Sequence, residues 1–468
     1  MSAQFTQAQI TNRLQFENPW WQSDKIDSYY SRMRHRKYFE LFYPLVTMRE
    51  IKRAVVLMGP RRVGKTVMLY HAIQKLISEG IDASNICYLS LESPLYSGMH
   101  LEALLQLYFR TNNKKPSQET YVFFDEIQYL KDWEVHLKSL VDSYHHVKFV
   151  VSGSAAAALK LKSRESGAGR FTDFQLPALT FYEFLLLTGR DGLVTTTSVD
   201  GEEVDTVSDI ATLNDAFVEY INFGGYPEVS LSKAILKDPS RYFRNDIIDK
   251  VLMRDLPSLY GISDTQELNS LFTYLAFNSG GELSLEGISQ HSGVAKNTIR
   301  KYLTYLQAAF LIRIVGRIDH NAKRFKRATF FKVYLTNPSL RSALFSPIER
   351  DDEAMGNMVE TAIYSQSRQA DNEPVYYARW KSGEVDMVQL DPSTQKPAFC
   401  LEIKWSNKPV TNLNKLKNAR QFCTKHGLSR LLVTSIDVTR IVEYSDVDVE
   451  FIPAALYCYR IGKSSLEG

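Results

Sequence analysis

The sequence predicts an α/β multidomain chain whose clearest part is a parallel sheet with helices on both faces. Three observations lead to this prediction. Between residues 50 and 180, short apolar runs alternate with longer helical stretches. A glycine-rich phosphate-binding motif follows the first of these runs. Similar short runs return after residue 355 and indicate a second α/β unit. The strands expected in the first set cover residues 53–58, 86–91, 121–124, 148–151 and 171–176.

Length and composition limit the class of protein. The chain has 468 residues, which suits two to four domains, and it is 44% apolar and 23% charged, as folded chains are. A net charge of +3 gives no global argument for nucleic acid, so any such surface must be a local patch. Four scattered cysteines exclude a disulfide scaffold and a cysteine zinc site. Neither a signal peptide nor an apolar run of about 20 residues is present, so we expect a cytoplasmic protein with no membrane partner.

The changes of pattern along the chain predict five regions. They are an N-terminal helical lead-in (1–45), a P-loop ATPase domain (46–212), a helical lid or linker (213–262), a winged-helix domain (263–345) and a second α/β domain (346–468). The polar segment 190–212, at the end of the second region, is predicted to be an insertion or loop.

A phosphate-binding loop occupies residues 59–66, where GPRRVGKT matches the pattern GxxxxGK[ST] in full. In such a loop the backbone N–H groups and the N-terminus of the next helix surround the phosphates. We expect Lys65 to reach the β- and γ-phosphate oxygens and Thr66 to bind Mg²⁺. The residues predicted to contact ATP here are Gly59, Pro60, Arg61, Arg62, Val63, Gly64, Lys65, Thr66 and Val67.

The partners of this loop are expected on neighbouring strands. The strand at 121–124 leads into Asp125, a predicted Mg²⁺ ligand, and Glu126, which would polarise the attacking water. The next strand leads into Ser152 and Ser154, which either contact the γ-phosphate or form a small-residue turn. Arg170 is the candidate arginine finger, a side chain that would contact a neighbour's nucleotide in a homo-oligomer. Arg164 is a second candidate for that role. The alternative is that this segment is a solvated basic loop.

These motifs resemble a family of bacterial and archaeal AAA-type ATPases joined to a region called DUF4143. The matching segments also include GRFTDFQLPALTFYEF at 169–184, GGYPEV at 224–229 and Arg254-Asp255. The resemblance implies an AAA-like sheet with strand order 5-1-4-3-2, and the Arg170 role is carried over by analogy with AAA proteins. It implies no settled activity.

Residues 283–307 have the spacing of a helix-turn-helix, with a second helix expected at 295–308. Two β-rich runs, 311–317 and 329–335, flank a basic segment and predict a wing. The candidate DNA contacts are Lys296, Asn297, Thr298, Arg300 and Lys301 on the helix and Lys323, Arg324, Lys326 and Arg327 on the wing. The alternative is a winged helix used for packing or oligomerisation.

Carboxylates in the last region form a second constellation. Asp386 lies on one expected strand and Glu402-Ile403-Lys404 on the next, so strand alternation places Glu402 and Lys404 on one face. Two carboxylates can hold Mg²⁺ or Mn²⁺ while a lysine orients or deprotonates water. Glu360, in a helix expected at 354–365, is a candidate third acid. The alternative is an ordinary ion pair on an exposed strand.

This arrangement resembles the PD-(D/E)xK nuclease fold over residues 355–435, with Val385 in place of the proline of the motif. The resemblance implies that Asp386, Glu402 and Lys404 are catalytic, and Gln421 stands at a position that the fold often uses. The serines lack His and Asp partners for a serine hydrolase.

Together the motifs predict an ATP- and Mg²⁺-binding ATPase that binds DNA and cleaves it with a metal-dependent C-terminal domain, hydrolysis changing the angle between the ATPase core and the winged helix. The alternatives are an ATP-gated switch or scaffold whose last domain binds without cutting, and a simple DNA-binding regulator, which the large ATPase core disfavours.

Overall fold

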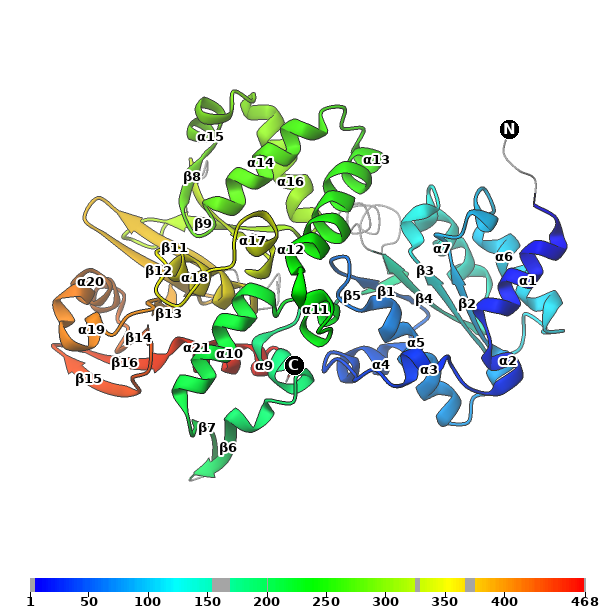
Figure 1. The fold of residues 1–468 in the computed structure, drawn as a ribbon, viewed down its shortest axis with the longest axis horizontal. Helices are drawn as coiled ribbons and strands as arrows, with labels where there is room; N and C mark the ends of the chain where they lie inside the picture. Colours follow the sequence, from blue (N-terminus) through cyan, green and yellow to red (C-terminus); the bar gives the residue numbers. More distant parts are fainter. Residues whose placement is uncertain (1–4, 154–168, 200, 325–328, 367–374, 467–468) are drawn as a thin grey trace. The chain divides into compact units, whose positions relative to one another are not determined.

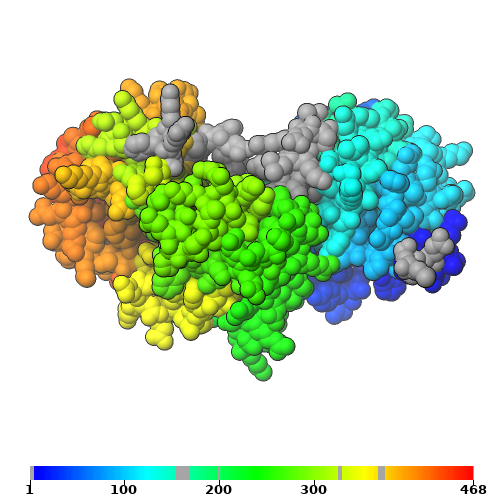
Figure 2. All heavy atoms as spheres, turned by 90° about the horizontal axis from the view of Figure 1, so that it is seen from above, coloured from blue at the N-terminus to red at the C-terminus, as the bar shows by residue number. Residues whose placement is uncertain are grey.

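A computed structural model describes residues 5–153, 169–199, 201–324, 329–366 and 375–466. The chain forms two compact units, Met1–Pro177 and Ala178–Gly468 (Figure 1). In the space-filling view, segments of the second unit that are far apart in the sequence lie against one another, so that unit is a single body (Figure 2).

The N-terminal residues are helical, as expected. They form α1 (Gln7–Glu17), α2 (Trp20–Ser23), α3 (Ser28–Ser31) and α4 (Phe39–Thr47). The buried ring of Trp20 donates from Nε1 to the carbonyl of Ile86, and Asn18 exchanges two hydrogen bonds with the backbone of Tyr88. The end of α1 and the start of α2 are therefore attached to β2, an edge strand of the first sheet.

The first sheet is a five-stranded parallel sheet in the order β2-β3-β4-β1-β5. This confirms the order 5-1-4-3-2 that the resemblance implied. Every strand of it is made of residues that the apolar runs predicted within one to three positions. The strands are β1 (Ala54–Met58), β2 (Ile86–Ser90), β3 (Thr120–Asp125), β4 (Val147–Gly153) and β5 (Phe171–Gln175).

Helices connect these strands, as parallel pairing requires. The main ones are α5 (Lys65–Ser78), α6 (Leu101–Thr111) and α7 (Trp133–Ser143), with short 3₁₀ turns at Ala83–Asn85, Pro94–Tyr96 and Ile127–Tyr129. β1 and β4 are buried along their whole length, because helices cover both faces of the sheet.

The second unit is organised around a nine-stranded mixed sheet in the order β15-β16-β14-β13-β12-β11-β9-β10-β8. Its strands are β8 (Glu282–Ser284), β9 (Ile312–Ile318), β10 (Phe330–Leu335), β11 (Val375–Trp380), β12 (Gly383–Leu390), β13 (Pro397–Glu402), β14 (Arg430–Ser435), β15 (Arg440–Tyr444) and β16 (Val447–Pro453). The strands expected for the wing, β9 and β10, pair antiparallel, and β9 also pairs parallel with β11. The regions predicted as separate winged-helix and C-terminal domains thus share one sheet.

Helices pack on both faces of this sheet. One apolar core joins it to α9 (Phe181–Leu187), α10 (Ile210–Phe223), α18 (Met355–Gln366) and α21 (Ala454–Ser464). The other joins it to α20 (Lys417–His426). The remaining α-helices described are α11 (Pro227–Leu231), α12 (Pro239–Tyr242), α13 (Leu256–Tyr260), α14 (Thr265–Phe277), α15 (Leu285–Ser292), α16 (Lys296–Ala308), α17 (Ser339–Leu344) and α19 (Lys408–Thr411). There are also two π-helical segments, η6 (Phe243–Ile248) and η7 (Val251–Asp255), and three 3₁₀ turns, η4 (Asp191–Leu193), η5 (Ile235–Lys237) and η8 (Leu413–Leu416).

Two features differ from the sequence prediction. Residues 178–212, grouped there with the ATPase domain, belong to the second unit, because α9 packs against α10 and α21. The segment 190–212, expected as an insertion or loop, contains a β-hairpin of β6 (Val194–Val199) and β7 (Glu202–Val207). Its run of β-branched threonines favours a strand, and Thr195 and Thr206 hydroxyls meet across it at 3.0 Å.

None of the helices in the described part of the chain is both long and apolar enough to cross a membrane.

Candidate functional site

The phosphate loop connects β1 to α5 in the first unit, as predicted. Gly59 follows the strand where the backbone of Leu176 approaches closely: a Cβ built on Gly59 would lie 2.1 Å from the Leu176 carbonyl oxygen. Gly64 and Arg62 have φ values of 97° and 63°, in the left-handed region. The loop therefore needs glycine at position 59 for space and benefits from it at 64 for conformation.

Lys65 is the first residue of α5 and is buried. Its ammonium donates to the carbonyls of Gly59 and Pro60, at 3.0 and 2.7 Å. The amine thus lies over the loop that would bind the phosphates.

Asp125, at the end of β3, is the centre of a buried hydrogen-bond cluster. Its Oδ2 accepts from the hydroxyls of Thr66 at 2.7 Å and Tyr88 at 2.8 Å, and its Oδ1 accepts from the hydroxyl of Ser152 and, at 3.1 Å, from the backbone N–H of Glu126. Burial and the neighbouring Glu126 carboxylate raise the pKa of Asp125, while three hydroxyl donors oppose them. The structure therefore brings together Thr66, Asp125 and Ser152, three residues predicted from three separate motifs.

Glu126 follows Asp125 with a left-handed backbone, φ 56°, and begins the turn Ile127–Tyr129. Its backbone N–H is 3.3 Å from the Ser152 hydroxyl, and its carboxylate accepts from the Gln128 side-chain amide. Strand alternation alone would place Glu126 on the opposite face from Asp125; the left-handed residue changes the direction of the chain here.

The remaining first-unit candidates have different outcomes. Arg170 forms an ion pair with Asp142 of its own chain, with both side chains more than 40% exposed. Ser154 and Arg164 lie outside the described residues.

Two residues of this site were not predicted. Tyr88 belongs to an apolar run that indicated only a strand. Arg36, in the N-terminal region, is buried and donates to the carbonyls of Val63 at 2.8 Å and Pro177 at 3.2 Å. The basic cluster at residues 32–37 was the available signal for Arg36.

The carboxylates of the second unit also come together. Lys404 Nζ lies 2.7 Å from Asp386 Oδ2 and 2.8 Å from Glu402 Oε2. β12 and β13 are adjacent strands, and the backbone N–H of Ile403 donates to Asp386 Oδ2 at 2.9 Å. The predicted Asp, Glu and Lys are therefore one contact group, with both acids buried.

The surroundings shift the pKa values of these three side chains in different directions. Burial would raise the pKa of Asp386, but Lys404 and Lys332 outweigh it and the pKa is lowered. Burial and the nearby Asp386 raise the pKa of Glu402 to about 8. Burial would lower the pKa of Lys404, and the two carboxylates reverse this and raise it. The group therefore holds one acid whose charged form is favoured, one acid whose protonated form is favoured and one charged lysine.

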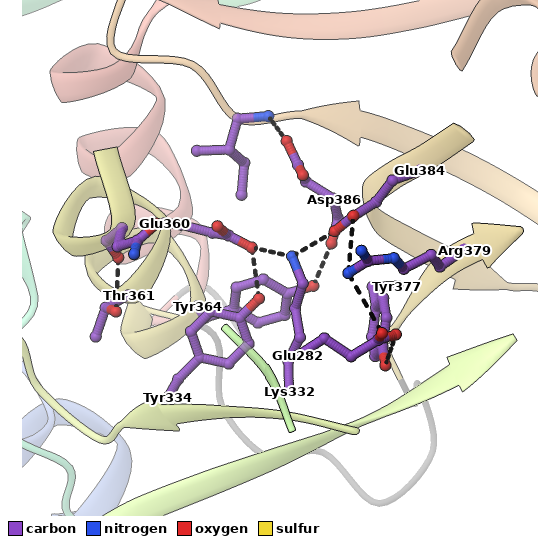
Figure 3. Close-up of polar contacts among 12 residues, drawn as sticks. Glu282, Lys332, Tyr334, Glu360, Thr361, Tyr364, Tyr377, Arg379, Glu384 and Asp386 are labelled. Atoms are coloured by element: carbon purple, nitrogen blue, oxygen red, sulfur yellow. Dashed lines mark hydrogen bonds and ion pairs between the residues drawn. The ribbon is translucent and has the colours of Figure 1, made fainter. Parts of the chain in front are cut away.

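Glu360, the candidate third acid, lies on α18 and has other partners. Its Oε1 accepts from Lys332 Nζ at 2.9 Å and from the Tyr334 hydroxyl at 2.5 Å (Figure 3). Burial raises its pKa to about 7. Gln421, on α20, is exposed.

Among the described residues, no three His, Cys, Asp or Glu side chains form a group that could hold a metal ion. Asp386 and Glu402 are nevertheless two buried carboxylates that already share one cationic partner. Mg²⁺ is commonly held by one or two carboxylates and several waters, so this donor pair fits such an ion.

The predicted DNA contacts lie on the exposed side of α16 and beyond β9. Ile299, Leu303 and Leu306 are buried, whereas Lys296, Asn297, Arg300 and Lys301 are exposed and Thr298 is half-buried. Lys296 pairs with Glu286, and Arg300 donates to Asn297 at 2.9 Å. Lys323 is exposed, and the Arg324 guanidinium lies 5.0 Å from the Tyr376 ring. Lys326 and Arg327 lie outside the described residues.

Two family models match parts of the chain. Residues 51–185 match the model of an AAA domain. Residues 214–352 match a domain of unknown function, DUF8612, where the resemblance had implied DUF4143 further along the chain. With the sheet order and the phosphate loop, the AAA match shows that the first unit has a P-loop ATPase fold.

Three curated relatives match most of the chain, and each is described as an uncharacterized protein. An uncharacterized protein of Haemophilus influenzae is 26% identical over 64% of this chain and 70% of its own length. Two uncharacterized proteins of Methanocaldococcus jannaschii are 24% and 23% identical, over 75% and 74% of this chain and 76% and 74% of their own lengths.

Solved structures show weak overall similarity. A Walker-type ATPase of Pyrococcus abyssi has a TM-score of 0.40 and 14% identity, covering 66% of this chain and 94% of that chain. The ORC2 protein of Aeropyrum pernix, in complex with ADPNP and ADP, has a TM-score of 0.37 and 14% identity, covering 65% and 91%. The conclusions below depend on the family match and the geometry of the sites.

Proposed function

We propose that the first unit binds and hydrolyses ATP with Mg²⁺. The observation that carries this proposal is the contact between Thr66, in the phosphate loop, and Asp125, at the end of β3. A hydroxyl after the lysine of the motif and an acid at this strand end are the two side chains that P-loop proteins use around Mg²⁺.

The side chains divide the work of hydrolysis. Lys65 would exchange its two carbonyl partners for the β- and γ-phosphate oxygens. Thr66 and Asp125 would hold Mg²⁺, which supplies positive charge to those oxygens. Glu126 would accept a hydrogen bond from the attacking water, and Ser152, fixed by Asp125, would keep that acid in place.

Nucleotide titration tests this site. Lys65→Ala should weaken binding of a fluorescent ATP analogue by about 100-fold or more, since the lysine contacts two phosphates. Lys75→Ala is a matched control on the same helix, because Lys75 is exposed and pairs with Glu79. Unchanged binding in Lys65→Ala would refute the assignment.

For the second unit we propose metal-dependent cleavage of DNA. The observation that favours it is that Asp386 and Glu402, on neighbouring strands, both contact Lys404. The order of elements supports it: α18 is followed by the antiparallel strands β11, β12 and β13, then by α20 and the parallel strand β14. A helix and a mixed sheet in this order are what the PD-(D/E)xK resemblance implies.

In this proposal Asp386 and Glu402 would hold Mg²⁺ or Mn²⁺, which would make a bound water more acidic and supply positive charge to the phosphate. Lys404, which is protonated here, would orient the attacking water. The exposed residues of α16, with Lys323 and Arg324, would contact the DNA backbone and the major groove.

A plasmid assay tests this function. Supercoiled and single-stranded DNA are incubated with Mg²⁺ or Mn²⁺, with and without ATP. We expect nicking that Asp386→Asn abolishes and that the exposed control Asp448→Asn leaves within about two-fold. Absence of cutting by protein that still hydrolyses ATP would refute cleavage and favour the ATP-gated binding switch.

We also propose that Arg170 reaches a neighbour's nucleotide in a homo-oligomer. Its pair with Asp142 is on the surface, where ion pairs are weak and easily exchanged. Arg170→Ala should then lower ATP hydrolysis only at protein concentrations where oligomers form, as light scattering would show; an equal loss in monomeric protein would refute the finger.

A further inference from the structure

Lys332 is a buried lysine between two carboxylates beside the candidate metal site. It lies on β10, and its side chain is 5% exposed. Its Nζ is 2.9 Å from Glu360 Oε1 on α18 and 2.8 Å from Glu384 Oε1 on β12, and 5.3 Å from the centre of the Tyr377 ring (Figure 3). A buried ammonium is stable only when its charge is matched, and here two acids match it.

The two acids that Lys332 contacts have further partners. The Tyr334 hydroxyl donates to the same Glu360 oxygen at 2.5 Å, and Arg379 lies 3.5 Å from the second oxygen of Glu384. Arg379 is itself tied to Glu282, at 3.3 Å. These side chains converge from five elements, β8, β10, β11, β12 and α18 (Figure 3). Both acids are thus committed to cations or hydroxyls of the protein.

Asp386 and Glu402 are in a different situation. Their shared partner, Lys404, has a side chain 37% exposed, compared with 5% for Lys332. A half-buried lysine on a flexible stem can swing into water when another cation arrives, whereas a fully buried one cannot leave without stranding its charge. A divalent ion can therefore replace Lys404 between Asp386 and Glu402 but cannot replace Lys332.

We propose that Lys332 is a fixed counter-ion: it pairs with Glu360 and Glu384 and so keeps both carboxylates from binding metal. The Asp386–Glu402 pair then binds a single divalent cation. This inference rests on the proposed metal site and adds its stoichiometry. Lys332 is a positioning residue, and Glu360 is not a metal ligand.

Counting bound Mn²⁺ tests this directly. The full chain, free of nucleotide, is titrated with Mn²⁺, and free ion is measured by electron paramagnetic resonance. The number of Mn²⁺ ions that the protein loses when Asp386→Asn is introduced is compared between variants. Because Asp386 is far from the phosphate loop in the sequence and lies in the other unit, this difference counts ions at the Asp386 site and not at the loop. We expect one such ion in the wild type, and the same ion in Glu360→Gln with a dissociation constant within about three-fold.

Removing the lysine should change the count. In Lys332→Met the freed Glu360 and Glu384 carboxylates should admit a second ion, so that the protein binds one more Mn²⁺ than the wild type, whereas Lys332→Arg should bind the same number as the wild type. Circular dichroism checks that each variant is folded, and Glu360→Gln decides the question if Lys332→Met is not. Two ions in the wild type, loss of the ion in Glu360→Gln, or no second ion in folded Lys332→Met would overturn the role of Lys332. No Asp386-dependent ion in the wild type would overturn the metal site as well.

Discussion

The hydroxyl of Thr66 and the carboxylate of Asp125 are joined by a 2.7 Å hydrogen bond although 59 positions separate them in the chain. Thr66 is in the first turn of α5, and Asp125 ends β3. Because β3 and β1 flank the same strand, β4, the carboxyl ends of these parallel strands meet at one edge of the sheet. The meeting of Thr66 and Asp125 at the proposed nucleotide site therefore follows from the strand order.

Replacing Thr66 by valine should separate metal use from nucleotide binding. The substitution keeps the shape and removes the hydroxyl, so we expect hydrolysis with Mg²⁺ to fall about 100-fold while metal-free ATP binding changes less than about five-fold. Steady-state phosphate release and a nucleotide titration measure the two effects. Thr111→Val is the control, since its hydroxyl bonds only the carbonyl of Leu107 in its own helix. Normal hydrolysis by Thr66→Val would contradict the assignment.

Gly59→Ala should damage the phosphate loop through a steric clash. The new Cβ would approach the Leu176 carbonyl oxygen to 2.1 Å, so either the loop or the end of β5 must move. We expect ATP affinity to fall at least about ten-fold and the first unit to lose roughly 1–3 kcal/mol of stability. Gly356→Ala, at a helix position with no atom within 4 Å of the new Cβ, should be neutral or slightly stabilising. Wild-type affinity in Gly59→Ala would show that the loop is not constrained there.

The buried His71 should make the stability of the first unit depend on pH. Burial, with His35 stacked at 4.1 Å, lowers the pKa of His71 to about 4. An unfolded histidine binds a proton below about pH 6.5, whereas the folded one stays neutral to about pH 4. The free energy of unfolding should therefore fall by about 1.4 kcal/mol per pH unit as the pH drops from 6.5 toward 4.

His71→Gln should remove this dependence. Urea denaturation at pH 7 and pH 5 gives the free energy of unfolding of the unit whose transition Mg·ATP shifts. The loss of this free energy between pH 7 and pH 5 should be about 2 kcal/mol smaller in the variant than in the wild type. His145→Gln, on an exposed position, should behave as the wild type. An equal pH difference in His71→Gln and the wild type would contradict the effect.

The first sheet could be predicted from sequence because each of its strands is a short apolar run next to a turn or motif residue. Asp125, Thr66 and Ser152 could be placed near each other because parallel strands end at one edge. Tyr88 could not, because nothing in a buried apolar strand distinguishes a tyrosine whose hydroxyl meets Asp125 from one that only packs. Arg36 was equally hidden, since its contact with Val63 depends on the path of the N-terminal helices.

The second unit was harder to predict because its sheet is assembled from distant segments. The helix-turn-helix at 283–307, the β-rich runs at 311–317 and 329–335 and the two strands that carry Asp386 and Glu402 were expected. The pairing of β9 with β11, however, is a tertiary contact between segments about 60 residues apart, and no periodicity in the sequence indicates it. Strands β15 and β16 were not predicted. Lys332 lies in an otherwise apolar strand, and only the positions of Glu360 and Glu384 show why a charge is stable there.

The central claim is that the first unit hydrolyses ATP with Glu126 activating water, and one comparison tests it most directly. Steady-state hydrolysis is measured at saturating Mg·ATP for the wild type, Glu126→Gln and the exposed control Glu119→Gln. The account predicts a rate at least about 100-fold lower in Glu126→Gln, with ATP affinity within about three-fold and Glu119→Gln unchanged. A wild-type rate in Glu126→Gln, or no hydrolysis by wild-type protein that binds Mg·ATP, would contradict it.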